Sequence, residues 1–156
     1  VSSFLNLWTS SIMISFSQDN CSSSKIGVLR GLHYQIPPIS QGKLVRCTAG
    51  EIFDVAVDLR KASPTYGNHY SINLKSTSYM GLYIPEGFAH GFLSLEDNTH
   101  LCYRTNAKHN PDAEGAISPF DMQLDIDWGL DREQIMVSEK DKNAQSFDEY
   151  VNEPKF

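Results

Sequence analysis

Hydrophobic and polar residues alternate most regularly in the stretch from Glu51 to Leu59. Every odd-numbered position from 53 to 59 is hydrophobic, whereas the even-numbered positions include two aspartates, Asp54 and Asp58. A period of two places successive side chains on opposite faces of an extended strand. The pattern therefore predicts a β-strand at Glu51–Leu59 with one buried face.

Short segments of the same kind recur along the chain, separated by residues that favour turns, such as Ala49-Gly50 and Asn110-Pro111-Asp112. Strands spaced by about 8–12 residues are typical of an all-β sandwich, jelly roll or barrel. The charged tail from Asp131 to Tyr150 indicates short helix or turn. Further strands are predicted at Ile12–Phe16, Lys25–Leu32, Gly42–Thr48, His69–Leu74, Tyr79–Ile84, Gly91–Leu95 and His100–Thr105.

The composition is that of one globular domain. Of the 156 residues, 40% are hydrophobic and 21% are charged, which is ordinary for a chain that buries one core. The net charge of −6, without any basic block, argues against a nucleic-acid partner. No apolar run approaches the length of about 18 residues that spans a membrane, so we expect no membrane partner either.

The ends and the cysteines bear on localisation. Cys21, Cys47 and Cys102 are odd in number and show no spacing typical of metal ligands, which favours a reduced, cytoplasmic protein. The segment Val1–Phe16 is apolar and serine-rich but lacks the basic start of a signal peptide. Because the first residue is not Met, we expect the start of the chain to be missing.

Two glycine-bounded runs concentrate the groups that could perform chemistry. Arg30-Gly31-Leu32-His33-Tyr34-Gln35 offers an anion binder and a potential base, and Lys43 follows ten residues after the histidine. The second run, residues 84–92, contains His90. Histidine titrates near neutral pH, and arginine can bind phosphate or sugar oxygens with its forked guanidinium group. In an all-β pocket, these groups would meet a small anionic ligand.

Together with other blocks in the same order, these runs resemble the dTDP-4-dehydrorhamnose 3,5-epimerase family. The resemblance covers roughly residues 16 to 145, and several blocks in the right order are more specific than any single one. The matching blocks are residues 18–20, 27–35, 41–46, 54–60, 63–67, 84–92 and 138–141.

The resemblance implies a single cupin-type jelly-roll domain over residues 1–156, with a short helical C-terminal segment. It also implies a homodimer and the cofactor-free, metal-free epimerisation of a nucleotide-linked 4-keto-6-deoxyhexose, of the type dTDP-4-dehydro-6-deoxyglucose to dTDP-4-dehydrorhamnose. Family members carry further residues upstream, in a strand that often crosses to the partner subunit. We expect this chain to lack that N-terminal strand region.

Epimerisation beside a ketone needs a base, a group that stabilises the enolate, and an acid on the opposite face of the sugar. Position by position, the resemblance makes His33 the base, Asp141 its orienting partner, Tyr103 the acid and Lys43 a candidate enolate stabiliser. A carboxylate partner raises the basicity of a histidine and fixes its tautomer. A tyrosine is neutral at pH 7 and can donate a proton.

The resemblance also implies a set of substrate-binding residues. His109 stands where the family usually has a tyrosine that stacks on the nucleobase, and its smaller ring offers less stacking area. A CDP- or GDP-linked sugar therefore stays open as an alternative. Phe88 and Phe92 are predicted to be core residues. The other positions that match family binding residues are Gln18, Asn20, Arg30, His90, Glu114 and Lys140.

Other functions stay open at this point. Pro85-x-Gly87-x-x-His90 resembles half of the metal-binding pattern of cupins, but His33-Tyr34-Gln35 breaks the His-x-His half, and Lys43 would repel a cation. A 3,4-ketoisomerase of nucleotide sugars would share the fold, and a non-catalytic sugar-nucleotide binder would share the pocket. The residues do not decide between inversion at C3, at C5 or at both.

Overall fold

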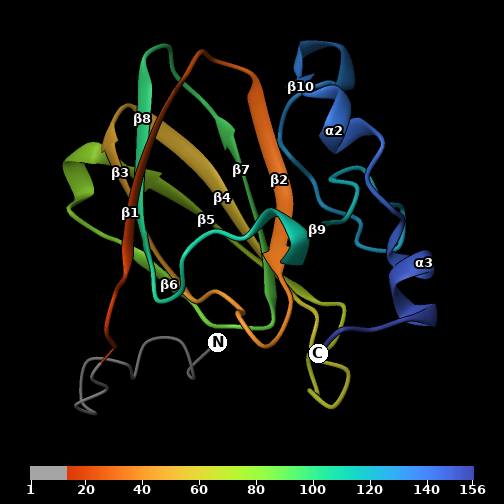
Figure 1. The fold of residues 1–156 in the computed structure, drawn as a ribbon. Coiled ribbons are helices and arrows are strands. Elements are labelled where there is room, and N and C mark those ends of the chain that lie inside the picture. The colour runs from red at the N-terminus through yellow and green to blue at the C-terminus, as the bar shows by residue number, and fades with distance from the viewer. Residues whose placement is uncertain (1–13) are drawn as a thin grey trace.

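Two mostly antiparallel sheets build the fold that the computed structural model describes for residues 14–156 (Figure 1). The four-stranded sheet has the order β1-β8-β3-β6, and the six-stranded sheet has the order β10-β2-β7-β4-β5, with β9 beside β2. This confirms the predicted all-β sandwich. The strands are β1 (Gln18–Ser24), β2 (Val28–Gln35), β3 (Lys43–Ala49), β4 (Glu51–Asp58), β5 (His69–Lys75), β6 (Leu82–Ile84), β7 (Phe88–Ser94), β8 (Thr99–Thr105), β9 (Glu114–Ala116) and β10 (Met136–Val137).

Apolar side chains from both sheets fill the space between them. Val45 and Leu101 of the four-stranded sheet belong to one buried cluster with Ile52 and Leu74 of the six-stranded sheet. Phe88 and Phe92 are buried in the same cluster, as the sequence predicted. This apolar core holds the two sheets face to face.

The prediction that β4 buries only one face is wrong. Ile52 and Ala56 lie in the cluster between the sheets, whereas Val55 and Val57 lie in a second buried cluster on the opposite face. The C-terminal part of the chain covers that second face, with Trp128 among the residues of the cluster. Both faces of the strand are therefore removed from water, which local alternation alone does not reveal.

The observed strands differ from the predicted ones mainly at their ends. β2 continues to Gln35, so His33 lies inside the strand rather than after it. The strand predicted at 12–16 is wrong for residues 14–16, which belong to no strand, while residues 12 and 13 lie outside the described residues. Pairing begins instead at Gln18, opposite Thr105. The predicted strand Tyr79–Ile84 is shorter, because β6 covers only Leu82–Ile84.

Short helices follow the sheets, as the charged tail predicted. The α-helices are α2 (Glu139–Lys142) and α3 (Phe147–Asn152), which lie on the β2 side of the sandwich in Figure 1. The side chains of Ser138 and Ser146 cap their first turns by accepting backbone N–H groups. In residues 14–156, no helix is long and apolar enough to cross a membrane. The 3-10 helices are Ser76–Ser78, Pro111–Ala113 and Arg132–Gln134.

Candidate active site

His33 and Asp141 form a direct side-chain pair although 108 positions separate them in the chain. The His33 Nε2 atom lies 2.7 Å from the Asp141 Oδ1 atom, and the Gly31 backbone N–H donates to Asp141 Oδ2 at 3.3 Å. Burial raises the pKa of the Asp141 carboxyl, but the hydrogen bond from His33 and the Gly31 amide outweigh this and hold the pKa below its usual range. An ionised Asp141 accepts from Nε2–H, which leaves the lone pair of His33 on Nδ1.

A glycine brings this pair into position. Gly31 has a φ of +116°, and a Cβ atom there would lie 2.5 Å from the Cα atom of Gly91 and 2.6 Å from the carbonyl oxygen of His90. The β2–β7 register shifts between Arg30 and His33, which marks a bulge at this point. A bulge re-aims the side chains that follow it. Only glycine allows this close approach, and the approach sets where His33 lies.

Lys43 lies next to the base. Its Nζ atom donates to the carbonyl oxygen of His33 at 3.4 Å, and the residue is only 7% exposed. Burial lowers the pKa of Lys43 to about 8, although the negative charges of Glu114 and Asp54 act in the opposite direction. A buried ammonium group beside the base can stabilise an anion that forms there.

Tyr103 comes from the opposite sheet. It is half-buried on β8, opposite Asn20 of β1 and Val45 of β3. Burial raises the pKa of its phenol, as does the charge of Glu114, while Arg30 lowers it. Glu114 and Arg30 belong to β9 and β2, in the sheet that carries His33. The phenol therefore stays protonated and can donate.

The sequence prediction missed Asp54, which is the partner of His90. His90 Nε2 lies 3.1 Å and 3.0 Å from the two carboxylate oxygens of Asp54, and both residues are buried. His90 sits opposite His33 in the β2–β7 register. The available signal was an aspartate in a strand with hydrophobic neighbours, because a fully buried carboxylate needs a partner.

Five of the predicted binding residues fall into two groups. On β1, Gln18 donates from Nε2 to Asn20 Oδ1 at 2.8 Å and accepts the backbone N–H of His109 at 2.8 Å, which joins three of these residues. Near Asp141, the Lys140 ammonium pairs with Glu114. Burial raises the pKa of Glu114, but the contact with Lys140 outweighs it and holds the pKa below the usual value.

The remaining predicted residue, Arg30, is exposed on β2, and the side chain of His109 is also exposed. Both can therefore reach a ligand from solvent. Within residues 14–156, no three His, Cys, Asp or Glu side chains gather in a way that could hold a metal ion. The half-pattern ending in His90 is instead engaged with Asp54.

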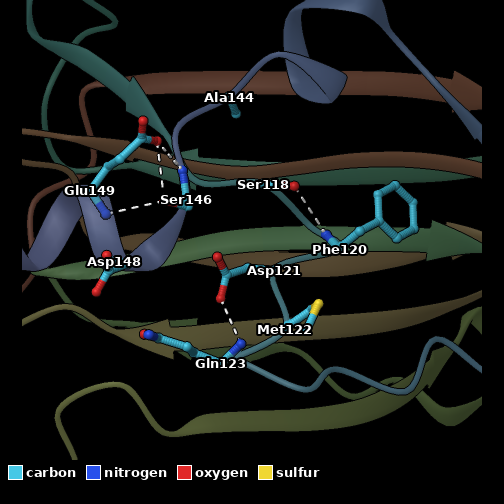
Figure 2. Close-up of a pocket in the computed structure, with 9 residues that line it drawn as sticks. All are labelled: Ser118, Phe120, Asp121, Met122, Gln123, Ala144, Ser146, Asp148 and Glu149. Atoms are coloured by element: carbon cyan, nitrogen blue, oxygen red, sulfur yellow. Dashed lines mark hydrogen bonds between the residues drawn. The ribbon is translucent and has the colours of Figure 1, made fainter.

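A groove of about 980 Å³ opens beside Asn20 and Tyr103. Its other walls include mostly apolar side chains of β3, β5 and β6, and Tyr103 is the only proposed catalytic residue that lines it. A smaller hollow of about 560 Å³ lies between the loop at 118–123 and the start of α3 (Figure 2). The predicted site residues do not line that hollow, and its Asp121 already accepts the backbone N–H of Gln123.

Comparison with known proteins decides the family. The family model described as dTDP-4-dehydrorhamnose 3,5-epimerase matches residues 3–149. The chain belongs to the dTDP-4-dehydrorhamnose 3,5-epimerase family. It is 48% identical over 134 residues to the dTDP-4-dehydrorhamnose 3,5-epimerase of Shigella flexneri, an alignment that covers 86% of this chain and 73% of the relative. The resemblance seen in the sequence is thereby confirmed.

Solved structures of this epimerase family share the fold. The crystal structure of dTDP-4-dehydrorhamnose 3,5-epimerase from Elizabethkingia anophelis has a TM-score of 0.85 at 42% identity, covering 86% of this chain and 74% of that one. The dTDP-6-deoxy-D-glucose-3,5-epimerase of Legionella pneumophila, solved in complex with dTDP-4-keto-L-rhamnose, has a TM-score of 0.83 at 44% identity, covering 88% and 72%. These matches confirm the cupin-like jelly roll.

Proposed function

We propose that the protein epimerises a dTDP-4-keto-6-deoxyhexose, converting dTDP-4-dehydro-6-deoxyglucose to the dTDP-4-dehydrorhamnose type, without a cofactor or metal. The observation that carries this proposal is the pairing of His33 with a buried Asp141 at 2.7 Å. Tyr103 of the other sheet, whose phenol burial keeps protonated, is the proposed acid. A base on one side and an acid on the other are what inversion at a carbon beside a ketone requires.

In this mechanism, His33 removes the proton alpha to the ketone with its Nδ1 atom. Asp141 holds the ring through Nε2 and stabilises the imidazolium that forms. The negative charge that develops on the sugar oxygen is stabilised by the Lys43 ammonium, which lies beside the His33 carbonyl group. Tyr103 then returns a proton to the opposite face of the carbon, which inverts it.

The binding residues fit the rest of such a substrate. Arg30 is exposed near the site and can bind diphosphate oxygens with two parallel hydrogen bonds. His90, whose Nε2–H donates to Asp54, can present its Nδ1 atom as an acceptor to a hydroxyl group of the sugar. Gln18 and Asn20 lie beside the segment that carries His109, where the nucleobase would stack. Glu114 and Lys140 lie close to His33, the proposed catalytic base, and complete the proposed site.

Incubation with dTDP-4-keto-6-deoxyglucose in D2O, followed by NMR, tests the proposal directly. Each inverted carbon takes up one deuterium, so label at C3, at C5 or at both also reads the specificity. Absence of label together with intact binding would instead support a non-catalytic binder. A product with the keto group moved from C4 to C3 would indicate a 3,4-ketoisomerase. Loss of activity with EDTA and recovery with one added metal would indicate a metal-dependent cupin.

We further propose that the protein is a cytoplasmic homodimer of single jelly-roll domains. Three apolar side chains of the groove beside Tyr103 are exposed, at 37% for Leu44, 81% for Tyr79 and 49% for Met80. Grouped apolar exposure of this kind is typical of interaction surfaces. Cys21, Cys47 and Cys102 are free thiols, which suits a reducing compartment.

A further inference from the structure

Gln35 is a buried polar residue at the end of β2, two positions after His33. It is 3% exposed, so its amide group has to find partners within the protein. Because side chains alternate along a strand, Gln35 lies on the same face of β2 as His33. Across the β2–β9 ladder it pairs with Glu114. Gln35 thus links the strand that carries the proposed catalytic base to the loops that contain Ile39 and Lys108.

The Gln35 amide uses both of its ends to hold the segment that carries His109. Its Nε2 atom donates to the carbonyl oxygen of Lys108 at 3.1 Å, and its Oε1 atom accepts the backbone N–H of Asn110 at 2.9 Å. Nε2 also donates to the carbonyl oxygen of Ile39, in the loop that precedes Lys43. The backbone on either side of His109 is therefore bound to one side chain.

Segment 106–110 has no strand or helix of its own to hold it in place. The N–H group of His109 is bound by Gln18 Oε1 at 2.8 Å, and the carbonyl oxygen of Ala107 accepts from Gln41 Nε2 at 2.9 Å. Side chains replace the ladder that would fix a strand. Gln35 contributes more of these bonds than the other side chains named here, and it is the most deeply buried of the three glutamines.

We propose that Gln35 is a positioning residue that holds the 108–110 segment, and with it His109, in the place where it meets the nucleobase. This inference rests on the proposed function for the identity of the ligand. A glutamine suits the role because it offers a donor and an acceptor in one rigid amide group. A glutamate would turn an oxygen towards the carbonyl groups of Lys108 and Ile39 and repel them.

The test compares Gln35→Met, which keeps the length of the side chain but makes none of these hydrogen bonds, with the wild type. We expect the Kd for dTDP, measured by calorimetry, to rise about tenfold, while kcat with the dTDP-4-keto sugar stays within about twofold. Hydrogen exchange of the ligand-free protein should become faster at the amides of His109 and Asn110. If Gln35→Met does not fold, Gln35→Glu keeps the acceptor for Asn110 and should change the Kd and the exchange in the same direction.

Gln145→Met is the matched control. Gln145 Nε2 donates to the hydroxyl group of Tyr34 at 2.8 Å. Tyr34 is next to Gln35 in the sequence, but it belongs to the buried cluster that contains Val55 and Trp128. This variant should lose stability but leave the Kd for dTDP and the exchange at 109–110 unchanged. An unchanged Kd in Gln35→Met, or a fall in kcat alone, would overturn the proposal. If the wild-type protein binds no dTDP, the proposed function fails. The positioning role is tested separately, because unchanged hydrogen exchange at residues 109–110 in Gln35→Met would overturn it whatever the ligand is.

Discussion

His33 is the residue on which the proposed chemistry depends most directly. His33→Gln keeps a side chain of similar size but removes the group that accepts the proton. We expect the exchange of substrate protons with D2O to fall by about 10²- to 10⁴-fold, while the affinity for dTDP changes little. NMR measures the first and calorimetry the second. Exchange at a rate near that of the wild type would show that His33 is not the base.

Lys43 predicts how activity depends on pH. Its pKa is lowered from 10.5 to about 8 by burial, so the ammonium group that would stabilise the enolate loses its proton above about pH 8. Since kcat/KM reports the ionisation of the free enzyme, we expect kcat/KM to decline about tenfold per pH unit on the alkaline side. A profile that stays flat to about pH 9.5 would exclude a required charge on Lys43.

The lowered pKa of Lys43 also predicts how the free energy of unfolding depends on pH. Because the pKa in the folded protein lies below that in the unfolded chain, stability rises with pH between the two values. Protonated Lys43 costs stability at neutral pH, and this cost disappears as the pH rises from about 8 towards 10.5. Lys43→Met should therefore raise the free energy of unfolding at pH 7 and lower activity. Urea unfolding of both proteins at pH 7 and pH 9 measures the difference, which should shrink at the higher pH.

His109 predicts the preference for the nucleobase. A tyrosine offers a larger ring, and aromatic contacts are worth about 0.5–1.5 kcal/mol beyond buried area. We expect His109→Tyr to increase the affinity for dTDP, relative to the affinities for CDP and GDP, by up to about tenfold, with little effect on kcat. Calorimetry with the three nucleotides measures this, and His100→Tyr, an exposed histidine near the other end of β8, is the control. The same relative affinities in the wild type and in His109→Tyr would show that position 109 does not contact the nucleobase.

At the scale of elements, the short helix α2 is what delivers Asp141 to His33. Ser138 caps this helix by accepting the N–H group of Asp141 itself at 3.1 Å. Ser146 caps α3 in the same way, by accepting the N–H group of Glu149 at 3.1 Å, yet α3 carries none of the proposed site residues. Replacing either serine by alanine removes the cap bond of one helix, and at Ser146 it also removes the bond that the hydroxyl donates to Glu149 Oε2. Ser146 therefore serves as the control for loss of a cap away from the site.

We expect Ser138→Ala and Ser146→Ala each to lower the free energy of unfolding by about 1 kcal/mol, as cap removal does elsewhere. Only Ser138→Ala should also lower kcat, by several-fold, because Asp141 is no longer held against His33. Thermal unfolding and steady-state kinetics measure the two effects. Equal kcat values in the two variants would mean that the cap of α2 does not position Asp141.

At the scale of the whole molecule, the apolar groove predicts self-association. Met80→Glu places a charge in the proposed interface, and we expect it to shift the protein to a monomer in size-exclusion chromatography with light scattering. Met122, 92% exposed beside the smaller hollow in Figure 2, supplies the control, because Met122→Glu should leave the dimer intact. A wild-type protein that is monomeric at micromolar concentration would contradict the proposed homodimer.

The sequence by itself determined the class of fold, most of the strands and most of the candidate residues. Alternation at 51–59 is a local property of the chain, and so are the turns that separate the segments. The family resemblance added His33, Tyr103 and Asp141 as a set, although spacing alone would have left Asp141 in a charged, solvated tail. The strand and turn signals can be read from the sequence because each depends on residues that are neighbours in the chain.

Only the tertiary structure decided which distant residues meet. The C-terminal segment covers the second face of β4, and this coverage buries a strand that the alternation predicted to be half-exposed. The β4–β7 pairing sets His90 beside Asp54, and the folding back of α2 sets Asp141 against His33. These contacts depend on strand order and register over long separations, because a carboxylate is solvated or buried according to what packs over it.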